Sequence, residues 1–114
     1  MSYPESINQL AIIVASGFQP SQLQDALIRE GFSFTEMDSS GGLLQESMTC
    51  LLVGLSRDQL SILLDMVRTI CKPIQQYVPV RVGLPEGYAN LPMVKVEVGG
   101  ATVYLLDVEH FEQL

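Results

Sequence analysis

Three acidic residues, Glu36, Asp38 and Glu46, flank a pair of glycines in the 114-residue chain. Carboxylates that lie close together can hold a metal ion or act as a general acid and base when burial or a neighbouring charge perturbs their pKa values. No histidine lies near them in the sequence, and nothing around them indicates a buried carboxylate. The pattern therefore indicates a solvated acidic rim rather than a metal site or an acid/base pair.

The two cysteines and the single histidine are the other residues that could carry chemistry. Cys50 and Cys71 both lie within apolar segments, and a free cysteine usually behaves as a small buried hydrophobe. His110 stands among charged and aromatic residues without a serine or cysteine partner in a recognisable motif. We therefore expect no metal site and no catalytic constellation, and we predict that the chain is not an enzyme.

A glycine-rich loop is the remaining candidate for binding. Gly41 and Gly42 could present backbone N–H groups to a phosphate, and a mobile loop without a ligand is the alternative. Leu43 and Leu44 follow at once, and leucines in a loop suggest burial against a ligand, another subunit, a partner protein or the loop itself. The residue types leave a binding role and a packing role open.

Composition limits the class of protein and its partners. An apolar content of 47 % is enough for one compact domain over residues 1–114. No apolar run approaches the roughly 18 to 20 residues of a membrane span, and the N-terminus lacks the pattern of a signal peptide, so we expect a cytoplasmic protein with no membrane partner. A formal net charge of −7 with scattered basic residues argues against a nucleic-acid polymer but not against a small nucleotide.

Hydrophobic periodicity predicts two β-α-β halves in succession, of which the first is compact. The apolar run Ile7–Ala15 predicts a buried strand. Pro20 is suited to the start of a short helix and Gly31 to its left-handed C-terminal residue. The alternation in Phe32–Met37 predicts a strand with one wet face, and a loop over Asp38–Ser47 follows.

The second half begins with a strand at Thr49–Gly54 and a well-marked helix. Ser56 and Gln59 form a capping-box signature, an apolar stripe continues to Cys71, and Pro73 ends the helix.

Prolines and glycines dominate the rest of the chain. Four of the six prolines fall between Lys72 and Pro92, which predicts a long loop with a short extended piece at Val78–Val82. Val94–Val98 and Thr102–Leu106 alternate around two glycines, which predicts a C-terminal hairpin.

The order of these elements predicts an α+β, ferredoxin-like fold (βαββαβ) with an extra C-terminal hairpin. In that fold both helices cover one face of an antiparallel sheet. The stretches at 11–14 and 50–53 are apolar on both sides, which is unusual for strands with one wet face. An oligomer that packs sheet against sheet would cover the second face.

Two blocks of the sequence resemble the PII-like family of bacterial cyclic di-AMP receptors. GFSFTEMDSSGGLLQESMTCLLVG, residues 31–54, is similar to the family's opening Gly-Phe, threonine-bearing strand, Ser-Thr-Gly-Gly-Phe-Leu loop and following Gly-Asn-Thr-Thr. VEVGGATVYLLDVEHFEQL, residues 96–114, follows the family's C-terminal block almost residue for residue. The resemblance implies a non-catalytic homotrimer of PII-like subunits that holds cyclic di-AMP, without another cofactor, in pockets between subunits.

The resemblance also divides the pocket residues into two groups. The implied nucleotide-binding set is Thr35, Gly41, Gly42, Leu43, Leu44, Gly54 and Gln113. All of these keep the family's residue type except Leu43, which replaces a phenylalanine. Ser33 replaces an arginine, and Ser47 with Met48 replaces Gly-Asn, so a cation, a stacking ring and an amide are lost. Without the resemblance, Thr35 is equally well an ordinary strand residue and Gln113 a polar terminus.

Two functions remain open. In the first, the trimer binds a small nucleotide such as cyclic di-AMP, and a loop change alters recognition of a regulated protein partner. A ligand achieves this only by binding one loop arrangement better than another. In the second, the trimer has lost cyclic di-AMP binding and acts through another small ligand or through protein contacts.

Overall fold

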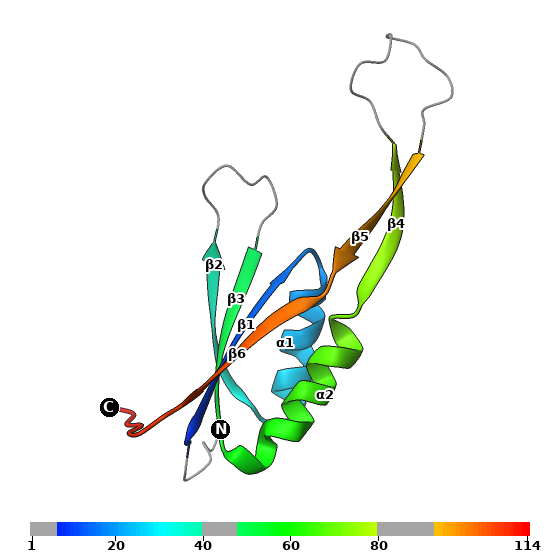
Figure 1. Ribbon diagram of the computed structural model, residues 1–114. Helices are drawn as coiled ribbons and strands as arrows, with labels where there is room; N and C mark the ends of the chain where they lie inside the picture. Colours follow the sequence, from blue (N-terminus) through cyan, green and yellow to red (C-terminus); the bar gives the residue numbers. More distant parts are fainter. Residues whose placement is uncertain (1–6, 40–47, 80–92) are drawn as a thin grey trace.

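The computed structural model describes residues 7–39, 48–79 and 93–114 of the chain (Figure 1). In chain order its elements are β1 (Gln9–Ser16), α1 (Gln19–Arg29), β2 (Ser33–Ser39), β3 (Met48–Leu55), the 3-10 turn η1 (Arg57–Gln59), α2 (Leu60–Ile70), β4 (Pro73–Pro79), β5 (Met93–Gly99) and β6 (Ala101–Asp107).

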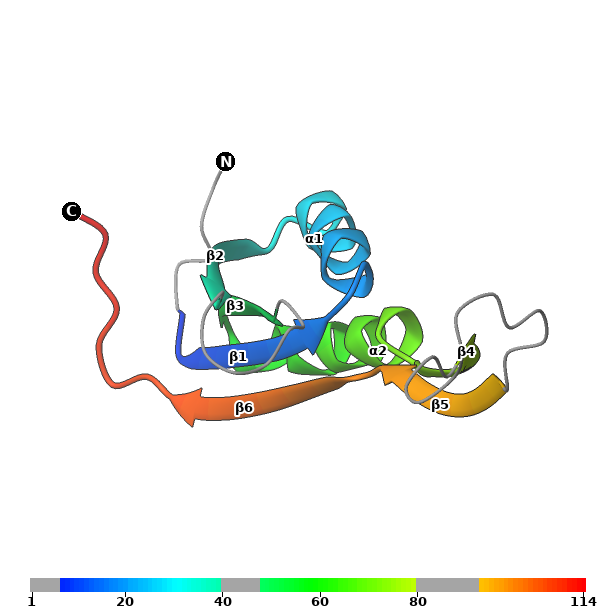
Figure 2. The same ribbon diagram turned by 90° about the horizontal axis from the view of Figure 1, so that it is seen from above.

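Four strands form an antiparallel sheet in the order β2-β3-β1-β6, and both helices cover one of its faces (Figures 1 and 2). This is the predicted α+β arrangement of an antiparallel sheet with two helices. The opposite face of the sheet, which we call the open face, is covered by neither of the described helices (Figure 2). β4 and β5 form a separate two-stranded ribbon that extends beyond the sheet (Figure 1).

α1 begins and ends at the predicted signals. Pro20 lies in its first turn, where a missing N–H costs no helical hydrogen bond. Gly31 takes a left-handed φ of 78° after the helix. The N–H of Gly31 then donates to the carbonyl of Ile28 at 3.1 Å, and the N–H of Phe32 donates to that of Leu27 at 2.9 Å. This is a Schellman motif, and it turns Phe32 into the core.

The capping signature before α2 is present in the structure. The N–H of Ser56 donates to Oε1 of Gln59 at 3.0 Å, and this bond closes η1 directly before the α-helix. Leu63 and Val67 are the buried side chains of α2. The predicted helix is confirmed, whereas its predicted apolar stripe is buried only in part, because Leu64 is half-buried.

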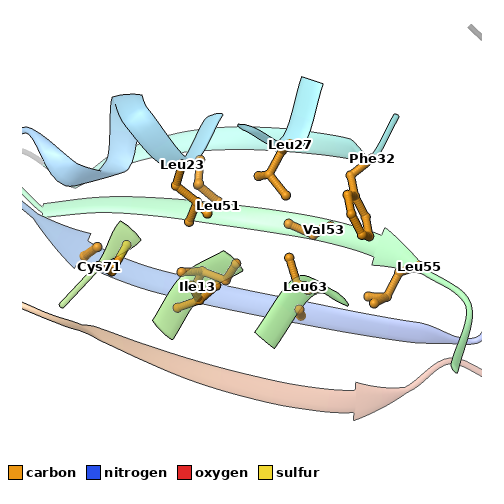
Figure 3. Close-up of a cluster of buried hydrophobic side chains, with 12 residues drawn as sticks. Ile13, Leu23, Leu27, Phe32, Leu51, Val53, Leu55, Leu63 and Cys71 are labelled. Carbon is orange, nitrogen blue, oxygen red and sulfur yellow. The ribbon is translucent and has the colours of Figure 1, made fainter. Parts of the chain in front are cut away.

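The core lies between the helices and the facing side of the sheet (Figure 3). Burial alternates strictly along β1, so that Ala11, Ile13 and Ala15 face the helices while their neighbours face the open side. Each fully buried aliphatic side chain contributes about 1.5 to 3 kcal/mol of transfer free energy. Cys71 belongs to this core, where burial raises the pKa of its thiol, whereas Cys50 is only half-buried. The interpretation of Cys71 as a buried hydrophobe is confirmed.

The predicted long loop from Lys72 to Pro92 is wrong in its first part, because Pro73–Pro79 is strand β4. Its two prolines stand at the first and last positions of a strand that pairs with β5 alone among the described strands, where an absent N–H breaks little of the hydrogen-bond ladder. Residues 80–92, which contain part of the predicted extended piece Val78–Val82, lie outside the described residues.

The predicted C-terminal hairpin is also wrong. β5 pairs with β4, with Ile74 opposite Val98, and β6 pairs with β1, with Ile13 opposite Val103. Gly99 and Gly100 have φ values of 86° and 83° and carry the chain from the ribbon into the sheet. A tight hairpin turn needs the same positive φ angles, so the glycine pair alone does not distinguish a reversal from this bend.

Candidate ligand site

A cavity of about 660 Å³ lies where β2 begins and β3 ends. The start of β1, the end of α1 and the C-terminal segment 108–114 complete its walls. Most of the lining is apolar, with the aromatic rings of Phe32, Phe34 and Phe111 among it. The volume falls within the roughly 300 to 1,000 Å³ that is usual for small-molecule pockets.

Three residues of the predicted nucleotide-binding set line this one cavity. Thr35 comes from β2, Gly54 from β3 and Gln113 from the C-terminal segment. In the sheet register Ser33 lies opposite Gly54, and Thr35 lies opposite Leu52. Because Phe34 packs against the core, strand alternation turns Ser33 and Thr35 toward the open face.

A polar frame holds the C-terminal segment against the start of β1. The N–H of Val108 donates to the carbonyl of Asn8 at 3.0 Å, and Nε2 of the buried Gln9 donates to Oδ1 of Asp107 at 2.7 Å. The N–H of Arg57 donates to Oδ1 of Asn8 at 2.9 Å. These bonds fix the root of the segment that brings Gln113 to the cavity.

Comparison with known protein families identifies the family of this chain. Residues 9–114 match the sequence profile of the family described as cyclic-di-AMP receptor. The chain belongs to the cyclic-di-AMP receptor family. The matched range contains all four lining residues that the resemblance singled out, Ser33, Thr35, Gly54 and Gln113.

Solved structures show the same fold. A functionally unknown protein from Pediococcus pentosaceus has a TM-score of 0.72 and 24% identity, with 96% of this chain and 100% of that chain covered. CPII from Thiomonas intermedia, bound to ADP, AMP and acetate, has a TM-score of 0.53 and 12% identity, with 90% and 89% covered. A DUF3240-family protein from Shewanella baltica has a TM-score of 0.53 and 17% identity, with 96% and 98% covered. These likenesses place the receptor-family chain among PII-like folds.

Ser33, which the resemblance predicts to depart from the family pattern, lies on the cavity wall. Its hydroxyl oxygen is buried and has no hydrogen-bond partner among the described residues. A buried polar atom left unpaired costs about 1 to 3 kcal/mol. The cavity wall therefore carries a hydroxyl that has no hydrogen-bond partner among the described residues.

Gly54 lines the cavity, and the packing of a neighbouring side chain also explains why this position is a glycine. A Cβ atom at this position would lie 3.2 and 3.4 Å from two side-chain carbons of Ile7. Glycine therefore lets Ile7, which also lines the cavity, pack directly on β3.

The charges around the cavity do not favour an anion. Glu112 is the one charged side chain among the described lining residues. Arg57 does not line the cavity, and its guanidinium lies 3.4 Å from Oδ1 of Asp107. This exposed ion pair contributes little to stability, but it places a carboxylate next to that cation.

The remaining predicted site residues are not among the described residues that line this cavity. Gly41, Gly42, Leu43 and Leu44 lie outside the described residues, as do Glu46 and Ser47. Met48 lies at the opposite end of β3 and lines a second cavity of about 710 Å³, together with Gly99, Gly100 and Thr102. Glu36 is exposed, as expected of a solvated rim.

The described ranges contain neither a candidate metal site nor a helix suited to span a membrane. Residues 7–39, 48–79 and 93–114 contain no group of three or more His, Cys, Asp or Glu side chains that could hold a metal ion. Neither helix in these ranges combines the length and the apolar character needed to span a membrane.

Proposed function

We propose that the chain is a non-catalytic, PII-like signalling protein that binds a small nucleotide in the cavity between β2, β3 and the C-terminal segment. The observation that carries this proposal is the convergence of Thr35, Gly54 and Gln113, from three distant parts of the sequence, on one cavity. Membership of the cyclic-di-AMP receptor family supports a nucleotide as the ligand. CPII, which has the same fold, was solved with ADP and AMP.

The open face supports a homotrimer. Leu10, Ile12 and Leu52 lie on this face and are only half-buried, and Tyr104 and Leu106 beside them are exposed. A contiguous apolar sheet face of this kind needs a partner. In the proposed trimer the open faces pack together, and the cavity at their edge is completed by the neighbouring subunit.

Sedimentation velocity tests the assembly. The parent chain is expected to sediment as a trimer at micromolar concentrations, and Ile12→Glu, which places a charge on the open face, is expected to dissociate it. Ile62→Glu is the matched control, because Ile62 is exposed on α2 and lies away from that face. A monomeric parent would contradict the trimer, and so would an Ile12→Glu variant that sediments like the parent.

Ligand binding is proposed to act through the two strands on either side of segment 40–47. Thr35 belongs to β2 and Gly54 to β3, and this segment joins the two strands. A ligand that engages both strands changes the preferred conformation of the segment only if it binds one arrangement better than another. The changed segment is then the surface that a regulated protein partner recognises.

Calorimetric titration with cyclic di-AMP tests the ligand. Binding is expected, and Thr35→Ala or Gln113→Ala is expected to weaken it by about 1 kcal/mol through a lost hydrogen bond. Thr69→Ala is the control, because Thr69 is exposed on α2 away from the cavity. Absence of heat and of any thermal shift at high ligand concentration would reject cyclic di-AMP as the ligand.

The ribbon supports a second candidate, a PII-like trimer that no longer binds cyclic di-AMP and acts through another ligand or through protein contacts. Ile74, Tyr77, Met93 and Val94 of β4 and β5 are between 40% and 65% exposed. Exposed apolar side chains gathered on a projecting element are typical of contact surfaces. This candidate gains if titration with cyclic di-AMP gives no binding while the trimer persists.

A further inference from the structure

We infer that the cavity recognises the uncharged base and sugar of its nucleotide, and that the phosphates add no affinity. This inference rests on the proposed function, since it concerns the ligand of the same cavity. The inference specifies which part of a nucleotide the cavity binds. It follows from the walls, the polar atoms and the charges of the cavity.

The walls are suited to a flat ring. Phe111, which is 45% exposed, lines the cavity together with the partly buried Phe34 and with aliphatic side chains such as Leu10 and Leu52, whereas the ring of Phe32 belongs to the core. Aromatic rings stack on other rings in offset or edge-to-face geometry and gain more than their buried area alone predicts. A heterocyclic base is the part of a nucleotide that such walls hold best.

The polar atoms of the cavity are neutral groups that both donate and accept. Ser33 and Thr35 supply hydroxyls, and Gln113 supplies an amide. The buried hydroxyl of Ser33 has no partner among the described residues, so a ring nitrogen, an amino group or a ribose hydroxyl would satisfy it. These groups complement the polar edge of a base or a sugar.

The charges oppose a phosphate. The described lining contains Glu112 and no arginine or lysine, and the whole chain carries a formal net charge of −7. Strong phosphate sites use charge-assisted bonds, above all from bidentate arginine. The described wall therefore holds no charge complement for a phosphate, and the neighbouring subunit that completes the cavity in the proposed trimer has the same formal net charge of −7.

A matched pair of probes tests the inference on the unmodified protein. Adenosine and AMP differ by one phosphate, and calorimetry gives the dissociation constant of each at low and at high salt. AMP is expected to bind about threefold to tenfold more weakly than adenosine, because its phosphate meets a carboxylate and no cation. High salt is expected to bring the dissociation constant of AMP closer to that of adenosine and not to weaken the binding of cyclic di-AMP, because screening reduces the repulsion between phosphate and carboxylate.

Substitution at Ser33 sharpens the test. Ser33→Arg is expected to strengthen AMP and cyclic di-AMP binding by about tenfold or more and to introduce a salt dependence, while adenosine binding does not improve. Ser33→Gln is the matched control, because it adds a long side chain without a charge. Circular dichroism and sedimentation establish that each variant folds and assembles like the parent.

The possible outcomes separate this inference from the function on which it rests. If AMP or cyclic di-AMP binds the parent at least about tenfold more tightly than adenosine, and high salt weakens that binding, phosphate recognition is present. The inference then falls while nucleotide binding stands. If the folded, assembled parent binds none of the three probes, the proposed nucleotide site falls with it.

Discussion

The sheet with its two helices and the β4–β5 ribbon are built from similar apolar and β-branched residues but are stabilised differently. In the sheet, one face is covered by α1 and α2, and its central side chains are fully buried. In the ribbon, Ile74, Tyr77 and Val94 remain largely exposed. A two-stranded ribbon is marginally stable by itself, so its stability and direction depend on how it is joined to the sheet.

That joint is polar. Gln19, at the start of α1, is 3% exposed, and its Nε2 donates to the carbonyl of Lys72 at 2.8 Å. Its Oε1 accepts from the N–H of Gly100 at 3.1 Å. Lys72 directly precedes β4 and Gly100 directly follows β5, so one side chain holds both ends of the ribbon. Apolar packing stabilises the sheet, whereas the two hydrogen bonds of Gln19 hold the base of the ribbon in position.

The largest effect is expected in the helix-covered core. Leu63→Ala is predicted to lower the free energy of unfolding by about 2 to 5 kcal/mol, because Leu63 is fully buried and the cavity left behind cannot close completely. Leu64→Ala is the matched control, because Leu64 is only half-buried. Chemical denaturation measures both. Equal losses for the two leucines would contradict the assignment of the core face of α2.

The next largest effect on stability is expected at the joint between the sheet and the ribbon. Alanine substitutions at two glycines there distinguish the cost of backbone strain from the cost of a steric contact with Gln19. Gly17 and Gly99 have φ values of 77° and 86°, so alanine at either costs about 1 to 2 kcal/mol in backbone strain. A Cβ on Gly99 would also lie 2.6 Å from Oε1 of Gln19, whereas a Cβ on Gly17 would meet nothing within 4 Å. Gly99→Ala is therefore expected to cost about 1 kcal/mol or more beyond Gly17→Ala in denaturation experiments. Equal costs would show that Gln19 does not hold the joint closely.

The sequence predicts the covered sheet well because its signals are local. Alternation along β1 and the glycine after α1 place these elements within two residues of their ends in the structure. The ribbon lacks such signals, because its prolines and glycines are equally typical of loops. The partner of β5 depends on which strand is free to pair, and the glycine pair does not carry that information.

The candidate site shows a similar division. Thr35, Gly54 and Gln113 were predicted through the family resemblance, and the structure brings them to one cavity. The frame around them was not predicted, because Gln9 and Asp107 lie 98 positions apart and neither belongs to a motif. Long-range polar pairs of this kind follow from the register of β1 with β6, in which these two residues are opposite.

A smaller effect is expected when the polar joint is removed. Gln19→Ala is predicted to lower the free energy of unfolding by about 1 to 3 kcal/mol, because two partly buried hydrogen bonds are lost. Hydrogen exchange of the amides in β4 and β5 is expected to accelerate more than exchange in β1. Gln22→Ala is the control, because Gln22 lies in the same helix and is exposed. Unchanged exchange in the ribbon would show that the strands hold their position without Gln19.

The smallest effect is a pH dependence at Cys71, the last core side chain before the ribbon. Burial raises the pKa of its thiol above the ordinary value, so the folded state retains a proton that the unfolded state releases above about pH 8.5. The unfolded state then binds fewer protons than the folded state, and stability falls as the pH rises through this range. Denaturation of the parent between about pH 7 and pH 10 is expected to show a loss that is smaller in Cys71→Ala, although other groups titrate in both proteins. If the parent and Cys71→Ala lose stability in parallel across this range, titration of the Cys71 thiol does not contribute to the pH dependence of stability.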